Sequence, residues 1–349
     1  MWRSTGLLAF LVAGATQAAE PLPVHVGGRT VAEADGSHRF GWPGTYFESR
    51  FDGTAVTVSA ESGSEFMRVL VDGEEKLVFK RPGRVDATLS ALPAGPHTIR
   101  LEKLTESQTA GGRFLGFFPA GDTRPLPPAA RARRIEYIGD SYAVGYGNTA
   151  PGRTCPGTGV HDTTDTQQAF GPILARKLDA DYRVVAYSGF GVVRNYNGGR
   201  RGESLPSLYP RLIPDDPAHV AGEEAAWKPH LIVINLGTND FSTPLHAGEP
   251  WATPEALRAA YRSRYVEFAR SLMRRNPEAQ LVLMGSDAFY GEVEQVAESL
   301  NRAAKRPVVT VRFGELELTG CDYHPSLADH RALADLLEKT LAGLPQPWR

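Results

Sequence analysis

The 349-residue sequence predicts two folds in succession, an antiparallel β-sandwich followed by an α/β domain on a parallel sheet. The first half contains short alternating strands separated by turn residues, and no long amphipathic helix interrupts them. The second half alternates almost continuously apolar strands with amphipathic helices, which is typical of a parallel sheet covered on both faces. The length is also that expected of about two domains.

Composition narrows the class of protein. Hydrophobic residues make up 42% of the chain and charged residues 22%, so the chain can fill two cores and is not intrinsically disordered. The 38 basic and 40 acidic residues nearly balance, which argues against a nucleic-acid partner. Two cysteines are too few for a disulfide scaffold or a four-thiolate zinc site, and no ligand spacing or phosphate-binding loop implies a metal or cofactor.

Residues 1–19 read as a signal peptide. Arg3 precedes an apolar run that ends near Ala13, and small residues follow through Ala18 and Ala19. The run is shorter than the ~20 residues that a membrane span requires, and no later segment is long and apolar enough. We therefore expect an exported protein, periplasmic or extracellular, without a membrane span.

The sandwich is expected over residues 21–124. The turn Asp72-Gly73 predicts a hairpin between two of its strands. Strands are predicted at 54–60, 66–71, 76–79 and 96–102. The proline-rich segment that opens with Pro125-Leu126-Pro127-Pro128 predicts a linker over residues 125–132.

The α/β domain is expected over residues 133–349. Its five strands are predicted at 134–138, 183–187, 230–235, 280–284 and 307–313. Apolar residues at helical spacing predict helices near 167–178, 257–272 and 293–300. A last helix begins at Ser326, where Asp329 three residues later completes a capping box.

Residues with catalytic chemistry follow four of these strands. Ser141 follows the first strand, Gly191 the second, Asn239 the third and His324 the fifth. The carboxyl ends of parallel strands meet at one edge of a sheet, so these residues should lie together. A serine becomes an effective nucleophile when an imidazole takes its proton, and the resulting oxyanion needs backbone and amide donors. Each residue alone has an ordinary structural explanation, but together they predict acyl transfer.

The motifs around these residues resemble the four signature blocks of the SGNH/GDSL hydrolase superfamily, over residues 133–345. The blocks are Gly139-Asp140-Ser141, Gly191, Gly237-Thr238-Asn239-Asp240 and His324-Pro325. The preceding sandwich and the stretches 189–195 and 321–326 make the chain similar to carbohydrate esterase family 2, acetylesterases of plant polysaccharides such as xylan and glucomannan.

This resemblance implies an SGNH-type three-layer α/β/α domain behind a jelly-roll-like sandwich. It also implies that Ser141 is the nucleophile, that His324 is the base, and that an oxyanion hole is formed by the N–H groups of Ser141 and Gly191 with the Asn239 side chain. An acetylated polysaccharide or oligosaccharide would be the substrate.

One position departs from the superfamily pattern. The usual acid lies three residues before the histidine, where this chain has Cys321. The carboxylate or the backbone carbonyl of Asp322 is expected to orient His324, and Asp287 is a weaker alternative. Cys155 and Cys321 both lie in loops at the reactive edge, so a disulfide between them is predicted; the alternative is two separate thiols.

Four further residues are candidates for substrate contact. Tyr323 adjoins the base, and Trp251 offers a second aromatic face for a sugar. Arg194 and Asn195 follow the expected oxyanion glycine and either contact substrate or brace the loop. The leading interpretation is a secreted carbohydrate O-acetylesterase. The alternatives are a lipase-like or thioesterase-like member of the same superfamily and a non-catalytic carbohydrate-binding protein. The oligomeric state is left open.

Overall fold

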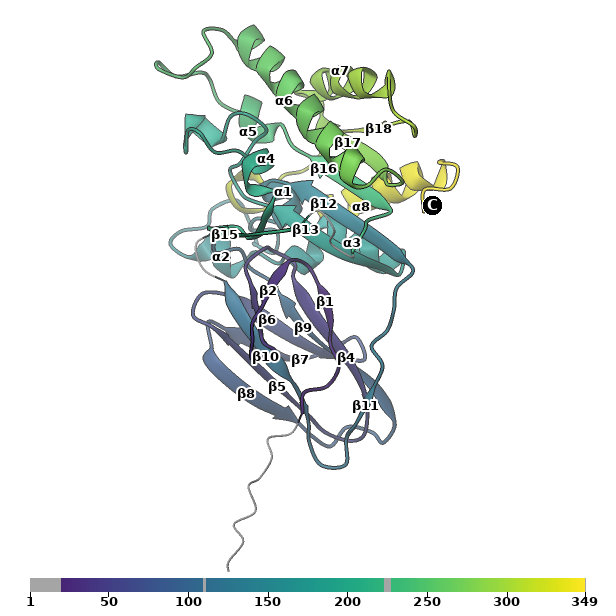
Figure 1. Ribbon diagram of the computed structural model, residues 1–349. Helices are drawn as coiled ribbons and strands as arrows, with labels where there is room; N and C mark the ends of the chain where they lie inside the picture. The colour runs from purple at the N-terminus through teal and green to yellow at the C-terminus, as the bar shows by residue number, and fades with distance from the viewer. Residues whose placement is uncertain (1–19, 109–110, 223–226, 349) are drawn as a thin grey trace, which may run out of the picture.

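The computed structural model describes residues 20–108, 111–222 and 227–348. The expected signal peptide, residues 1–19, lies outside the described residues. Figure 1 shows an antiparallel sandwich (purple to blue) below a parallel sheet with its helices (teal to yellow). Within the part of the chain that is described, no helix is both long and apolar enough to cross a membrane.

The N-terminal body is a sandwich of two antiparallel sheets. The first sheet has the order β1-β4-β9-β6-β7, with β11 paired to β4: β1 (His25–Gly27), β4 (Tyr46–Asp52), β9 (Pro96–Lys103), β6 (Phe66–Val71), β7 (Glu74–Lys80) and β11 (Arg124–Leu126). The second has the order β2-β3-β10-β5-β8: β2 (Thr30–Ala32), β3 (His38–Phe40), β10 (Gly112–Pro119), β5 (Val56–Ser62) and β8 (Gly83–Leu89). Apolar side chains alternate inward from both sheets and form one core that includes Phe47, Val58 and Phe114.

The sandwich contains more strands than its sequence pattern indicates. The β6–β7 hairpin at Asp72-Gly73 and strands β5 and β9 agree with the prediction. Strands β1, β2 and β3 have three residues each, too few for an alternating pattern to appear. The longer strands β4, β8 and β10 were not predicted either, and in β10 the register shifts between Phe114 and Gly116. The expected linker over residues 125–132 is corrected at its start, since Pro125 and Leu126 belong to β11 on the sandwich edge.

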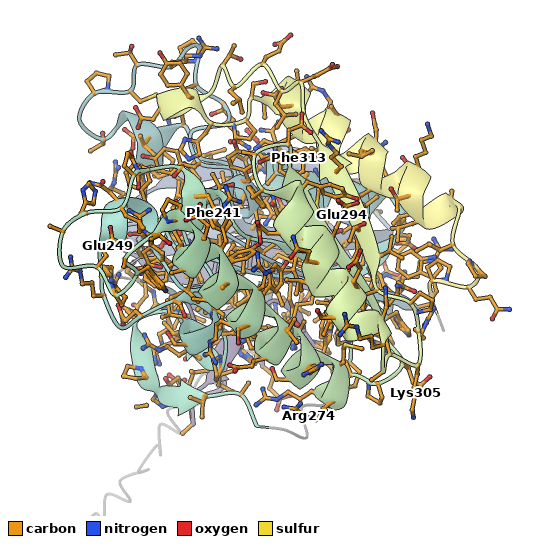
Figure 2. The ribbon with its side chains drawn as sticks, turned by 90° about the horizontal axis from the view of Figure 1, so that it is seen from above. Phe241, Glu249, Arg274, Glu294, Lys305 and Phe313 are labelled. Atoms are coloured by element: carbon orange, nitrogen blue, oxygen red, sulfur yellow. A yellow bond between two sulfur atoms is a disulfide. The ribbon has the colours of Figure 1, made fainter. Side chains whose placement is uncertain are left out.

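The second body is a three-layer α/β/α domain, as predicted. Its parallel sheet has the order β13-β12-β16-β17-β18: β13 (Ala180–Ala186), β12 (Arg133–Gly139), β16 (Leu231–Asn235), β17 (Gln280–Ser286) and β18 (Val309–Phe313). Helices α6 (Pro254–Arg275) and α7 (Tyr290–Asn301) cover one face. Helices α3 (Phe170–Lys177) and α8 (Leu327–Ala342) cover the other. Figure 2 shows α6 and α7 side by side, with Arg274 near the end of α6.

Short elements make up the loops at the carboxyl edge of this sheet and the hairpin beside the sandwich. They are α1 (Ser141–Val144), α2 (Gly159–Asp162), η1 (Thr166–Gln168), η2 (Tyr196–Gly198), α4 (Leu205–Leu208), β14 (Arg211–Ile213), β15 (Asp216–Val220), α5 (Thr238–Phe241) and η3 (Cys321–Tyr323). Ser141 lies on α1 and Asn239 on α5, and His324 directly follows η3. The rigid sheet therefore fixes where each loop begins.

The two bodies meet at η1 and β13 through polar contacts. Gln167 Nε2 donates to the carbonyls of Gly44 at 3.1 Å and Lys103 at 3.2 Å. Arg100 of β9 donates to Tyr182 Oη at 2.7 Å. The segment after β9 continues from this junction to the carboxyl edge of the parallel sheet, where Gln108 bonds to the chain after β13.

Candidate active site

The sharp turn after β12 places Ser141 at the reactive edge. Gly139 lies so close to α1 that a Cβ there would come within 2.5 Å of Ala143 Cβ. Asp140 caps α1, because its Oδ1 accepts from Tyr142 N–H at 3.1 Å. Ser141 is the first residue of the helix, and its own N–H points free of the helical ladder.

His324 lies against this serine in the geometry of a general base. Its Nε2 is 2.9 Å from Ser141 Oγ, and its Nδ1 is 3.0 Å from the carbonyl of Cys321. Because a carbonyl only accepts, Nδ1 carries the proton and Nε2 is free to take one from the serine. Burial lowers the pKa of His324, while the contact with the Cys321 carbonyl opposes that shift. The imidazole is therefore neutral at neutral pH, as a base must be.

Of the two groups of Asp322 that were expected to orient His324, the carboxylate does not do so; the carbonyl of Cys321 lies 3.0 Å from Nδ1, and a backbone contact with Asp322 also raises the pKa of the imidazole. Asp322 is exposed, and its carboxylate accepts from Tyr146 Oη at 3.2 Å instead of contacting His324. The left-handed φ of 50° at Asp322 turns its side chain away while presenting the preceding carbonyl, that of Cys321, to the imidazole. Asp287 is not involved either, since it pairs with Arg312 at 2.5 Å.

Gly191 is not placed as an oxyanion donor, which corrects a second prediction. Its N–H donates to Asn195 Oδ1 at 3.1 Å, and a Cβ there would strike Arg194 O and the Asp240 carboxylate. Gly189, two residues earlier, lines the pocket that contains Ser141. Gly189 has a φ of 83°, a conformation that favours glycine, and among the described residues none accepts from its N–H. The glycine that faces the reactive serine is Gly189.

Asn239 lies at the start of α5 on the same pocket. Its Nδ2 donates to the carbonyl of Phe190 at 2.9 Å and makes a longer contact of 3.3 Å with Asp140 Oδ2. Burial raises the pKa of Asp140 to about 7. Both N–H groups of the amide thus have acceptors, and the one to Asp140 makes the longer contact. Asn239 lines the same pocket as Ser141 and His324.

Arg194 and Asn195 brace the loop instead of facing the pocket. The buried Arg194 guanidinium bonds to Glu249 at 2.6 Å and to Thr243 Oγ1 at 2.9 Å. This arginine holds the pKa of Glu249 to about 2. Asn195 is also buried and holds the N–H of Gly191. Figure 2 places Glu249 on the long loop between α5 and α6.

The pocket itself is open and has mixed chemistry. It has a volume of about 740 Å³ and includes Ser141, His324 and Asn239 with the aromatic residues Tyr146 and Tyr196. Tyr323 also lines it and is 66% exposed, so its ring is accessible from solvent. Trp251 lies elsewhere, in a separate cavity of about 130 Å³ beside Glu249, which removes it from the immediate surroundings of Ser141.

A disulfide joins two loops of the site. Cys155 and Cys321 are bridged, with Cα atoms 5.6 Å apart. Cys321 is fully buried, and its carbonyl is the group that orients His324. Arg153 O accepts from Asp322 N–H at 2.9 Å on the same two loops. The bridge therefore fixes the backbone that holds the base.

Three contributors to the site were not identified from the sequence. Gly189 lies three residues after the end of β13 and two residues before Gly191, and the two glycines differ in backbone conformation and hydrogen bonding. The Tyr146 ring packs against the His324 ring in a tilted arrangement, with centroids 4.2 Å apart, and nothing in its sequence surroundings marks it. Gln108 comes from the sandwich, and nothing in the sequence around it indicates that it reaches the catalytic pocket. A rule that takes the first glycine after the strand would have found Gly189.

A parallel α/β sheet that presents this serine and histidine at its carboxyl edge defines a hydrolase of the serine-esterase type. Residues 135–337 match the model of the GDSL-like Lipase/Acylhydrolase family, and residues 26–128 match the Carbohydrate esterase 2 N-terminal model. The chain is 44% identical over 346 residues to an acetylxylan esterase / glucomannan deacetylase of Cellvibrio japonicus, covering 95% of each chain. The chain belongs to carbohydrate esterase family 2, and it is a carboxylic-ester hydrolase.

Solved structures agree with this assignment. A carbohydrate esterase whose active site displays divergent catalytic and non-catalytic binding functions matches with a TM-score of 0.89 and 42% identity, covering 95% of this chain and 100% of that one. A family 2 esterase from Clostridium thermocellum, in complex with cellohexaose, matches with a TM-score of 0.79 and 28% identity, covering 92% and 100%. The predicted sandwich-plus-hydrolase architecture is thereby confirmed.

Proposed function

We propose that this protein is an exported carbohydrate O-acetylesterase that removes acetyl groups from xylan or glucomannan through an acyl-enzyme. The observation that carries the proposal is the 2.9 Å contact between His324 Nε2 and Ser141 Oγ, with His324 Nδ1 held by Cys321 O. Export rests on the signal-peptide pattern of residues 1–19 and on the cysteine bridge, which suits an oxidising compartment.

The acylation step follows from this geometry. Ser141 Oγ attacks the acetyl carbonyl carbon while its proton passes to His324 Nε2. The imidazolium that forms is stabilised by the Cys321 carbonyl at Nδ1. The tetrahedral oxyanion receives hydrogen bonds from the N–H groups of Ser141 and Gly189 and from Asn239 Nδ2. The C–O bond to the sugar breaks, and the leaving oxygen takes the proton from His324.

Deacylation repeats these steps with water. His324 takes a proton from a water molecule, whose oxygen attacks the acetyl-serine, and the same donors stabilise the second oxyanion. Collapse of that intermediate breaks the bond to Ser141 Oγ, which recovers its proton from His324, and acetate leaves. One water molecule is consumed for each acetate released, and Ser141 and His324 return to their starting protonation states.

The substrate class is supported by the pocket and by the relatives. Tyr323 and Tyr196, which is 58% exposed, offer accessible rings of the kind that pack on sugar faces. The Cellvibrio japonicus relative carries both substrates in its name, xylan and glucomannan. A lipase-like role has less support, because polar groups such as Gln108, Asp322 and Ser188 line the pocket instead of an acyl groove.

Acetate release tests the proposal. Wild type should release acetate from acetylated xylan or acetylated glucomannan, and also from 4-nitrophenyl acetate, whereas Ser141→Ala should lose this activity. Ser242→Ala, on the same pocket, is the matched control. A wild-type protein that binds these polysaccharides without releasing acetate would reject the enzymatic role and favour carbohydrate binding.

A further inference from the structure

The sandwich reaches the catalytic pocket through residues 104–108, called here the sandwich loop. Gln108 from this loop lines the same pocket as Ser141 and His324. Two of its side chains bond to the backbone of Ser188, the residue before Gly189. Glu106 Oε1 accepts from Ser188 N–H at 2.9 Å, and Gln108 Nε2 donates to Ser188 O at 3.0 Å. Both backbone polar groups of Ser188 are thus held by the other body of the protein.

Ser188 O belongs to the same peptide unit as Gly189 N–H. A peptide unit is planar and trans, so its C=O and N–H point in opposite directions. A donor that fixes the direction of Ser188 O therefore also fixes the direction of Gly189 N–H. Gly189 has no side chain to restrain its backbone, and its φ of 83° is a conformation that glycine reaches without strain. The direction of this peptide unit therefore has to be fixed by a neighbouring group.

A hydrogen bond to Ser188 O also makes Gly189 N–H a stronger donor. A peptide whose carbonyl accepts a hydrogen bond is polarised, and its N–H becomes a better donor to an oxyanion. Gln108 supplies this bond from a neutral amide.

The sandwich loop is itself held in place. Tyr187 Oη donates to Gln108 O at 3.2 Å, and Arg200 donates to Tyr187 Oη at 2.8 Å. Gln108 has a left-handed φ of 63°, which is uncommon for a residue with a side chain and indicates that its surroundings determine the conformation. Burial raises the pKa of Glu106, in keeping with an enclosed carboxyl group.

We propose that Gln108 and Glu106 of the sandwich are positioning residues that aim the Gly189 N–H at the oxyanion, so that the hydrolase site is completed by the N-terminal domain. This inference rests on the proposed function and assigns the sandwich a part in the chemistry, whether or not it also binds polysaccharide.

The sharpest test is the isosteric change Gln108→Glu in the full chain. An ionised carboxylate cannot donate to Ser188 O and repels it, so kcat for 4-nitrophenyl acetate should fall about 10- to 100-fold at pH about 8, with KM changed little. As pH falls toward about 5, protonation restores a donor, and the ratio of variant to wild-type kcat should rise. Wild type and variant are compared at each pH, because His324 titrates in both.

Substitutions of Glu106 provide a second test. Glu106→Gln keeps an acceptor for Ser188 N–H and should retain most of kcat, whereas Glu106→Ala leaves that N–H without a partner and should lose it. Gln295→Glu and Glu294→Gln, on the exposed side of α7, are matched controls. Figure 2 shows Glu294 on that helix.

The outcomes separate the two proposals. An inactive wild type, or an active Ser141→Ala, contradicts the proposed function itself. An active wild type with unchanged kcat in Gln108→Glu shows that the peptide is aimed without the sandwich and overturns the inference. A loss of kcat whose ratio to wild type does not vary with pH also overturns it, because a general structural defect would not depend on the protonation of residue 108.

Discussion

At the residue scale, backbone groups fill two places in the site. For one of them, the group that orients the histidine, the sequence had suggested a side chain. The histidine is oriented by the carbonyl of Cys321, and the pocket glycine is Gly189. Asp322 contributes a carboxylate near the base that accepts from Tyr146 without touching the imidazole. Burial lowers the pKa of His324, and the hydrogen bond to the Cys321 carbonyl and, more weakly, the charge of Asp322 oppose that shift.

This arrangement predicts the pH dependence of the reaction. His324 accepts a proton only when it is neutral, and burial lowers its pKa below the ordinary value of about 6.5. The acidic limb of kcat/KM for 4-nitrophenyl acetate should therefore have its midpoint below pH 6.5, and activity should be retained in mildly acidic solution. A pH-rate profile measures it. A midpoint above 6.5 would show that a negative charge dominates the surroundings of the imidazole.

Asp322→Asn distinguishes a backbone orienter from a carboxylate. We expect kcat within about threefold of wild type, since the Cys321 carbonyl stays in place, whereas loss of an orienting carboxylate typically costs about 10⁴-fold. The substitution should also move the acidic limb to lower pH, because the negative charge that raises the pKa of His324 is removed. A steady-state profile checks both effects, with Asp287→Asn as the control. A collapse of kcat would restore Asp322 as part of the machinery.

At the scale of elements, the loops after β12 and β18 act as one unit. Gly147 O accepts from Cys321 N–H at 3.3 Å, and Arg153 bonds to the carbonyls of Leu318 and Glu317, each at 2.8 Å. The Cys155–Cys321 bridge closes a separation of 166 residues along the chain. The loop that carries the base is therefore tied to the loop that follows the nucleophile.

Removing this bridge should affect both stability and turnover. Cys155→Ser should lower the free energy of unfolding by about 2–4 kcal/mol, since the crosslink restricts the unfolded chain. It should also lower kcat at temperatures where the protein stays folded, because Cys321 O then holds His324 less firmly. Denaturant melts and steady-state kinetics measure the two effects, with the reduced wild type as the comparison. Unchanged kcat in the folded variant would show that the backbone contacts suffice.

At the scale of the whole molecule, the sequence predicts the strands and helices that follow a periodic apolar pattern. It does not predict features that depend on contacts between segments far apart in the chain. The five parallel strands and their helices follow from periodic apolar runs, and Ser141, Asn239 and His324 follow from strand ends. Choosing Gly189 over Gly191 depends on the turn that Asn195 and Asp240 impose, which no local pattern encodes. The part played by Gln108 depends on how the two bodies pack, and that packing is decided by buried polar groups.

These buried polar groups lead to a final prediction, which concerns the cooperativity of unfolding. Arg100 lies over the Tyr46 ring at 3.5 Å and bonds to Glu48 at 3.2 Å and to Tyr182 Oη, so it links both bodies. We expect wild type to unfold in a single calorimetric transition, because separating the bodies would expose these groups. Arg100→Ala should lower the stability of both bodies together by about 3 kcal/mol, since the buried carboxylates lose one partner. Arg84→Ala, in an exposed pair with Asp86, should change little. Two resolved transitions in the wild type would mean that the sandwich and the hydrolase domain fold independently and that their contact is incidental to stability.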